Sequence, residues 1–311
     1  MKHISEVNQI TGDLLRMISN PDGLLNGAFN IRENGECAAR QSTANIQLGS
    51  MAGKPGMTIT VAPGTKGETV YIPACVTKSD FNDLVYNDFF IGAGADVLIV
   101  AGCGVHADGE GDARHDGIHR FFIEENARVR YVENHIGVGE GSGRRVINPK
   151  TEIEIKDNGY FEMDSTQIKG VDSTSRVTLA KLAQDARLVI REKLMTHGSQ
   201  HAYTDFSVDL EGEDSGADLV SRSVARDTSK QVFRSVINGN ARCTGHSACD
   251  AIIMDTAVVS AIPELTAHNV DAALIHEAAI GKIAGEQLIK LMTLGLTREE
   301  AETRIIEGFL K

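Results

Sequence analysis

Hydrophobic and polar residues alternate position by position over most of the chain, from about residue 29 to residue 274. The run Thr-Glu-Ile-Glu-Ile at 151–155 is typical, and such runs are separated by Gly, Asn and Asp. Alternation with a period of two places apolar side chains on one face of a β-strand, while Gly, Asn and Asp favour tight turns. The pattern therefore predicts many short strands. They are expected at 58–61, 97–100, 129–132, 151–155, 160–163, 188–191 and 206–210.

A longer repeat runs through the same region. A small residue followed by a strand recurs at steps of 32, 32, 27 and 31 residues. A nearly constant step of about thirty residues is typical of β-solenoid coils, each of which buries its face on the next. A large β-sandwich is the alternative, because its strands alternate in the same way. The small residues of the repeat are Ala95, Ala127, Gly159, Ala186 and Ala217.

The two ends of the chain have a helical spacing instead. Apolar residues three or four positions apart predict an N-terminal amphipathic helix, ended by the Asn-Pro-Asp-Gly run at 20–23. Near the C-terminus, residues 282–292 predict one helix, and Thr297 with Glu300 forms a capping box that opens a second. The N-terminal apolar positions are Ile4, Val7, Ile10, Leu14, Leu15 and Ile18.

These patterns divide the chain into a helical segment at 1–28, a β core at 29–275 and a helical segment at 276–311. The C-terminal pair carries acidic residues where a DNA-recognition helix needs basic ones, which argues against DNA binding. An apolar helical pair with an acidic rim is better suited to docking another protein. The acidic residues are Glu299, Glu300, Glu302 and Glu307.

Composition narrows the classes of function. The chain has 311 residues and a formal charge of −12, from 43 acidic and 31 basic side chains, which argues against nucleic-acid or anionic-membrane surfaces. Its longest apolar runs, such as 97–101, are far too short to cross a bilayer, and the first residues lack the apolar stretch of a secretion signal. Five scattered cysteines suit a reducing compartment, so we expect a cytoplasmic protein.

The first group of chemistry-bearing residues lies near the C-terminal end of the β region. Cys243, His246 and Cys249 follow the spacing Cys-x2-His-x2-Cys, a moderate signal for a soft metal. A buried cysteine that behaves as a small apolar residue is the alternative. His276 and Glu277 could complete such a site, although Glu277 could equally stand at a helix start, where the dipole favours a carboxylate.

The second group is the stretch 103–119, which is the densest run of metal-ligand residue types in the chain. It contains Cys103, His106, His115 and His119, and the glycine between the last two predicts a loop rather than a metal-binding helix. A metal held by the three histidines would make the chain a β-helix or cupin-like hydrolase or lyase. A solvated functional loop is the other interpretation.

Several segments resemble one family closely. They are Cys-Asp-Ala-Ile-Ile-Met-Asp at 249–255, Ala-Ile-Pro-Glu-Leu at 261–265, His-Glu-Ala-Ala-Ile-Gly-Lys-Ile at 276–283 and the run from 286 to 309. These segments are similar to the C-terminal core of the SufB/SufD iron–sulfur cluster assembly scaffolds. The likeness extends from about residue 30 to 311 and is closest to the short, SufB-like (SmsB-type) form.

The resemblance implies a fold and a set of roles. The fold is a mainly β, right-handed parallel β-helix with a short N-terminal helix and a C-terminal helical segment that docks a SufC-like ABC ATPase. The cluster-holding cysteine of the family falls on Cys249, and its Glu-His-Glu motif falls on 275–277, with Ile275 in place of the first Glu. The sulfur-accepting cysteine falls on Cys103, 146 residues before Cys249.

The expected function is a non-enzymatic scaffold. A transient iron–sulfur cluster, of the [4Fe–4S] type, would be built between Cys249, His276 and Glu277 of two protomers, either of a homodimer or with a paralogue. Sulfur would arrive at Cys103 from a donor protein and leave as a cluster for apo-protein acceptors; no pattern in the chain indicates whether a flavin takes part. The rivals are the metal-dependent enzyme using His106, His115 and His119, and a metal-free adaptor for the ATPase.

Overall fold

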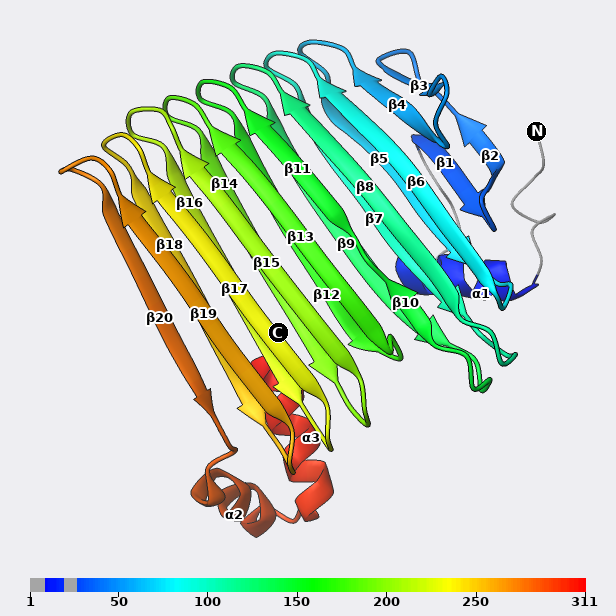
Figure 1. The fold of residues 1–311 in the computed structure, drawn as a ribbon, viewed down its shortest axis with the longest axis vertical. Coiled ribbons are helices and arrows are strands. Elements are labelled where there is room, and N and C mark those ends of the chain that lie inside the picture. Colours follow the sequence, from blue (N-terminus) through cyan, green and yellow to red (C-terminus); the bar gives the residue numbers. More distant parts are fainter. Residues whose placement is uncertain (1–8, 20–26) are drawn as a thin grey trace.

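The chain forms a β-solenoid in the computed structural model, which describes residues 9–19 and 27–311 (Figure 1). Within these residues the strands make two ten-stranded sheets that face each other, and the ten strands of the second include β11, which pairs with β8 and β13 beside the main strand order. All strand pairs are parallel except two hairpins at the N-terminal end, β1 with β2 and β3 with β4. The predicted solenoid is confirmed, and the sandwich alternative is wrong because neighbouring strands in each sheet come from successive coils.

The strands of each sheet follow one another along the solenoid. The first sheet contains, in spatial order, β2 (Glu36–Gln41), β1 (Ala28–Glu33), β5 (Lys66–Val76), β7 (Asp96–His106), β9 (Arg128–Val138), β12 (Tyr160–Lys169), β14 (Arg187–Thr196), β16 (Gly216–Ala225), β18 (Thr244–Ile253) and β20 (Ala273–Gly281). The second contains β19 (Val258–Ala267), β17 (Lys230–Gly239), β15 (His201–Leu210), β13 (Ser173–Leu182), β10 (Arg145–Ile147), β8 (Ala113–Ile123), β6 (Phe81–Ile91), β4 (Gly56–Val61) and β3 (Ile46–Ser50), while β11 (Lys150–Ile155) pairs with β8 and β13.

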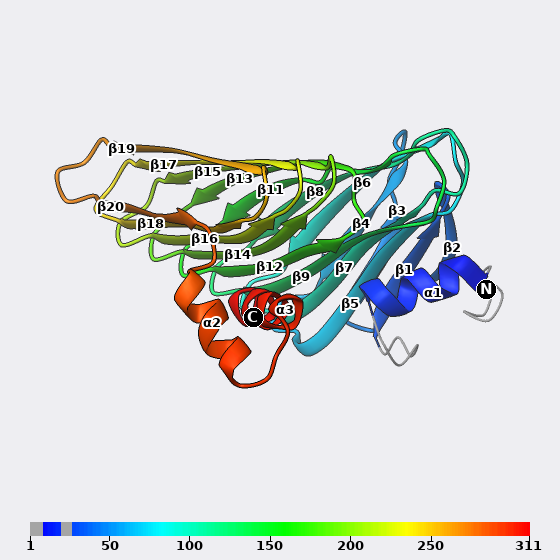
Figure 2. The same cartoon turned by 90° about the horizontal axis from the view of Figure 1, so that it is seen from below.

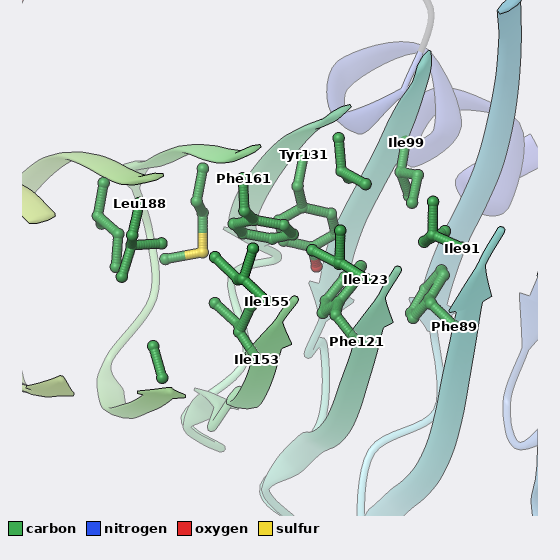
Figure 3. Close-up of a cluster of buried hydrophobic side chains, with 14 of the residues drawn as sticks. Phe89, Ile91, Ile99, Phe121, Ile123, Tyr131, Ile153, Ile155, Phe161 and Leu188 are labelled. Atoms are coloured by element: carbon green, nitrogen blue, oxygen red, sulfur yellow. The ribbon is translucent and has the colours of Figure 1, made fainter. Parts of the chain in front are cut away.

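Much of the interior is apolar. Inward-facing side chains stack on their counterparts in the next coil, as Phe89 does on Phe121 with ring centroids 4.3 Å apart (Figure 3). Tyr131 and Phe161 of the first sheet pack edge-on against Phe121, with ring centroids 5.2 and 4.9 Å away, and are fully buried. Such stacking gives each coil a hydrophobic face that only its neighbour can cover, which is why the solenoid propagates.

The turns between coils repeat one another as well. Asn126, Asn158, Asp185 and Asp214 each adopt a left-handed backbone conformation, with φ between 55° and 59°. Asn and Asp tolerate this conformation better than other residues with a side chain. The amide of each donates to a carbonyl of the next coil, as Asn126 does to Asp157 at 3.0 Å. The Asn and Asp residues that interrupt the alternation therefore mark the coil corners.

The helix α1 (Gln9–Ile18) packs on the outer face of the first sheet. It can approach closely because Gly102 has no side chain: a Cβ there would lie 2.7 Å from Cβ of Ile18. Leu14 and Ile18 are fully buried in this contact, so the helix covers the outside of β7. Of the helix predicted from the sequence, Ile4, Val7 and the terminating run at 20–23 lie outside the described residues.

The opposite end of the solenoid is uncovered. Leu265 of β19 pairs in register with the buried, inward-facing Ile237 of β17. It is nevertheless 37% exposed, because no further coil covers it. Two helices follow β20 and lie beside the first sheet, α2 (Gly285–Thr293) and α3 (Arg298–Phe309) (Figure 2). The predicted capping box of Thr297 and Glu300 is present at the start of α3.

Two further observations bear on the sequence analysis. The expected boundary between residues 275 and 276 falls inside β20, which continues to Gly281, because the alternating pattern runs on past His276. In the part of the chain that the structure describes, no helix is both long enough and apolar enough to cross a membrane.

Candidate functional site: a polar row inside the solenoid

One row of the first sheet is polar although it faces the interior. Strand register aligns Glu133 with Ser165, Ser165 with Glu192, Glu192 with Ser221 and Ser221 with Cys249. All five residues are at least 96% buried. Buried polar groups are costly unless they are paired, so a row of this length is an exceptional feature of the core.

Side chains from the facing sheet satisfy the carboxylates of this row. Arg176 of β13 is 2.6 Å from Oε2 of Glu133 and 3.4 Å from Oε1 of Glu192. Ser221 donates to Glu192 at 2.7 Å, and Thr204 donates to its other oxygen at 2.8 Å. The row is thus held by a buried network from β9 to β16, one strand short of Cys249.

Cys103 lies at the N-terminal end of this network. It is buried on β7, directly beside His135 of β9 in the strand register. His115 reaches it from β8 on the facing sheet, and both imidazoles are within hydrogen-bonding reach of the thiol. A small cavity of about 10 Å³, room for about one water, opens beside Cys103.

The two imidazoles are themselves held by ionised groups. Nδ1 of His115 is 3.1 Å from Oδ2 of Asp83, and Asp83 is paired with Arg32 at 2.7 Å. Nδ1 of His135 is 3.1 Å from the Arg176 guanidinium, and its Nε2 is 3.1 Å from Oε1 of Glu133. Cys103 therefore lies between two imidazoles, and charged neighbours hold each ring in place: Asp83 for His115, and Arg176 with Glu133 for His135.

These neighbours change the acidity of Cys103. Burial alone would raise the pKa of the thiol, but the charge of His115 and the hydrogen bonds of His115 and His135 outweigh it and lower the pKa to about 7. Burial likewise opposes a charge on His115, yet Cys103 and Asp83 raise its pKa to about 10. For Glu133, His135 and Arg176 outweigh burial and hold its pKa well below the usual range. A low thiol pKa is the condition for a nucleophilic cysteine.

Cys249 lies near the uncovered end and has the opposite character. Burial, with Glu192 and Asp250, raises the pKa of its thiol to about 12. His276 of β20 pairs in register with Ser247, two residues before Cys249, and its Nδ1 is 3.3 Å from Oγ of Ser247. Burial and then the charge of His246 lower the pKa of His276, which leaves a neutral imidazole available as a metal ligand.

The remaining expected ligands near Cys249 are placed elsewhere. Glu277 and His246 lie on the outer face of the first sheet, 3.7 Å apart, and His246 is also 2.7 Å from Asp218. Cys243 is buried in the apolar core just before β18. Within one chain, therefore, Cys249 and His276 share the inner face, while the Cys-x2-His-x2-Cys motif is divided among the core, the outer face and the inner face.

The histidines of the stretch 103–119 also separate. His115 and His119 are buried inside the solenoid, whereas His106 is at the end of β7, 3.2 Å from Asp108. The expected loop is wrong for most of this stretch, because residues 113–123 form β8 and only 107–112 connect the strands. Among residues 9–19 and 27–311 there is no group of three or more His, Cys, Asp or Glu side chains placed to hold a metal ion.

Sequence reasoning did not single out His135, Glu133, Arg176 or Glu192. The repeat contained the signal, because its 32-residue step carries Cys103 onto His135, and steps of 32 and 27 carry Glu133 onto Ser165 and then Glu192. The predicted 31-residue step from Ala186 to Ala217 was two residues too long. Ala217 pairs in register with Leu188, which is 29 residues earlier.

Comparison with known proteins identifies the family of the chain. Residues 84–309 match the family model described as SUF system FeS cluster assembly, SufBD core domain. The chain is similar to iron–sulfur cluster assembly SufBD family proteins of Archaeoglobus fulgidus, 29% identical over 82% of this chain and 68% of the relative, and of Methanothermobacter thermautotrophicus, 28% identical over 86% and 65%. A relative of that name from Pyrococcus horikoshii is 34% identical over 64% of this chain and 60% of its own length.

The chain belongs to the SufB/SufD family of iron–sulfur cluster assembly proteins. This membership connects it with iron–sulfur cluster assembly. The matches to these three relatives span between 60 and 68% of their lengths.

Proposed function

We propose that the chain is a non-enzymatic scaffold that accepts sulfur at Cys103 and carries it through the solenoid to a cluster assembled at Cys249. The observation that carries the proposal is the buried polar row that begins beside Cys103 and reaches Cys249 in one register. The two cysteines are five strand spacings apart in the first sheet, or about 24 Å at ~4.8 Å per strand. An apolar interior of that length would oppose passage of a sulfur anion.

The first step is a sulfur transfer. The Cys103 thiolate attacks the outer sulfur of a persulfide donor, the sulfur–sulfur bond of the donor breaks, and the donor leaves as a thiolate. Two equivalents of a small thiol then release the sulfur as hydrogen sulfide and are oxidised together to a disulfide, which returns Cys103 to its starting state. Hydroxyl and guanidinium groups along the row, including Ser221 and Arg176, supply hydrogen bonds for the small sulfur species.

The second step joins sulfur and iron near Cys249. Thiolate is the ligand that cluster iron prefers, and neutral imidazole is a weaker one, so ligation by Cys249 and His276 suits a cluster of the [4Fe–4S] type that must be handed on. Because the Cys249 thiol has a raised pKa, iron binding there must displace a proton.

A second protomer would complete this site. Both β19 and β20 lie at sheet edges, and exposed apolar side chains cluster there, including Ile262, Leu265 and Ile280. Unpaired edge strands with apolar surface invite pairing with another chain. We infer a homodimer, or a heterodimer with a paralogue, with the cluster at this seam and Glu277 contributing from the outer face.

The C-terminal helices supply the second surface, for a SufC-like ABC ATPase. Ile289, Met292 and Leu294 are 63%, 43% and 76% exposed on the helical pair. ATP hydrolysis by that partner would supply the work that opens the seam, so the scaffold itself needs no catalytic residue. Five unpaired cysteines suit a reducing cytoplasm.

The experiment is anaerobic reconstitution of the full chain, with its ATPase partner, using ferrous iron and sulfide. Thiolate-to-iron charge-transfer absorption should form in the unsubstituted chain and in Cys37→Ala, which removes an exposed cysteine. It should be lost in Cys249→Ala. Equal absorption in all three chains would exclude Cys249 as a ligand, and absence of colour from an intact complex would favour a metal-free adaptor.

A further inference from the structure

We propose that His115 and His135 are positioning residues that hold Cys103 as a nucleophilic thiolate, His115 as its charged partner and His135 as a neutral hydrogen-bond donor. This inference rests on the proposed function, in which Cys103 accepts sulfur. It concerns two residues that act on the sulfur transfer only through their effect on the Cys103 thiol.

The role of His115 follows from its two neighbours. It stands between the carboxylate of Asp83 and the thiol of Cys103, and its side chain is 98% buried. Asp83 accepts from Nδ1, which leaves Nε2–H to face Cys103. Arg32 pairs with Asp83 from the other side and keeps that carboxylate ionised. A proton shared between His115 and Cys103 is thus drawn to the imidazole, as in the thiolate–imidazolium pairs of cysteine nucleophiles.

His135 is oriented differently. A guanidinium can only donate, so the Nδ1 atom that lies 3.1 Å from Arg176 must accept. Burial opposes protonation of His135, whereas Glu133 and Cys103 favour it. The Arg176 contact decides against the protonated form, and His135 is a neutral ring with its proton on Nε2.

That Nε2–H has no well-aligned protein partner. It is 3.1 Å from Oε1 of Glu133, but it is buried without a hydrogen bond in the described structure. A buried donor without an acceptor destabilises the fold, and a thiolate at Cys103 is the acceptor within reach. The 10 Å³ cavity beside Cys103, which His115 and Glu133 also line, gives a transferred sulfur atom room next to the thiol.

The electrostatic surroundings of Cys103 are therefore set by groups from several strands. His119 is the instructive exception, since burial, despite the charge of Glu133, lowers its pKa to about 4 and it stays neutral. The titratable and charged groups around the site are Arg32 on β1, Cys75 on β5, Asp83 on β6, His115 and His119 on β8, Tyr131, Glu133 and His135 on β9, and Arg176 on β13.

The test is the ultraviolet absorbance of the thiolate, titrated between pH 5 and 10 as the difference between the chain and its Cys103→Ser variant. The unsubstituted chain should titrate near pH 7. His115→Asn should raise the midpoint by about 1–3 pH units, and His135→Asn should raise it less, because only the first removes a charge. His119→Asn is the matched control and should leave the midpoint unchanged. Unchanged midpoints in both His115→Asn and His135→Asn would overturn the inference.

A second measurement needs no substitution, in case His115→Asn does not fold. Nitrogen chemical shifts of the histidine rings at pH 7 should show His115 doubly protonated and His135 neutral with its proton on Nε2. A neutral His115 would contradict the assignment.

Sulfur loading separates this inference from the proposed function. With a small persulfide donor at pH 6, His115→Asn should load Cys103 about tenfold or more slowly than the unsubstituted chain, matching a thiolate fraction reduced by one pH unit or more. Loading of Cys103 at an equal rate in both would overturn the histidine roles and leave the function standing. A Cys103 thiolate that titrates as predicted but accepts no sulfur would overturn the proposed function and leave the histidine roles standing.

Discussion

Cys249 and Glu133 stand in the same inward-facing row of the first sheet, four strand spacings apart, and Ser165, Glu192 and Ser221 fill the positions between them. The row is straight because every coil from β9 to β18 keeps the parity of its inward-facing residues. Cys249, near the uncovered end, is therefore connected by register to a buried ion-pair network further along the solenoid.

Arg176 is the residue on which this network depends most. Arg176→Met would leave the carboxylates of Glu133 and Glu192 buried without their shared cation, and breaking a buried pair in this way costs about 3–5 kcal/mol. Arg234→Met is the control. The Arg234 side chain is 31% exposed and bridges Asp205 and Glu264 at the surface, so its substitution should cost about 0–1 kcal/mol. Urea denaturation measures both, and equal destabilisation would refute the assigned network.

The Asp83 carboxylate predicts a pH dependence of stability. Burial opposes its ionisation, but His115 and Arg32 outweigh burial and lower its pKa from 3.8 to about 2. A depressed pKa contributes stability that is present above the unfolded value and is lost as the pH falls through the folded value. Between about pH 4 and pH 2 this group should therefore lose about 2 kcal/mol.

Asp83→Asn removes this contribution. Its free energy of unfolding, measured by denaturation at each pH, should decline less steeply between pH 4 and pH 2 than that of the unsubstituted chain. Parallel declines would show that Asp83 is not the titrating group.

The uncovered end predicts the site of self-association. Leu265→Lys should keep the chain folded, because Leu265 is already 37% exposed, but should shift the chain from dimer to monomer in analytical ultracentrifugation. Leu179→Lys is a matched control: Leu179 is 39% exposed on β13, in the middle of the second sheet, and its substitution should leave the dimer intact. A dimer that survives Leu265→Lys and dissociates in Leu179→Lys would show that the interface lies on the second sheet near Leu179 and not at the uncovered end.

Much of this architecture could be predicted from the chain alone. The alternation and the repeat near thirty residues predicted the solenoid, because a coil is a short-range pattern in sequence. The capping box at Thr297 was readable for the same reason, since all its hydrogen bonds are local.

The interior network was harder to predict because its contacts cross between sheets. Strand register aligns Cys103 with His135, and the 32-residue step contained that pairing. No periodicity indicates that Arg176 reaches across to Glu133, or that His115 faces Cys103, because these contacts depend on how the two sheets are offset. The sequence therefore showed that the stretch 103–119 is rich in residue types that can bind metal. It did not show that the stretch is divided between β7 and β8.

The most direct test of the central claim follows labelled sulfur from Cys103 to the cluster. The chain is loaded with isotope-labelled persulfide sulfur, freed of donor, and given ferrous iron, a small thiol and an excess of unlabelled sulfide in solution. Transport inside the solenoid predicts that the acid-labile sulfide of the cluster keeps the label, and that Ser221→Val, which fills the row beside Cys249, loses it while the control Ser223→Val does not. Label diluted in proportion to the unlabelled sulfide, in every chain, would contradict the account.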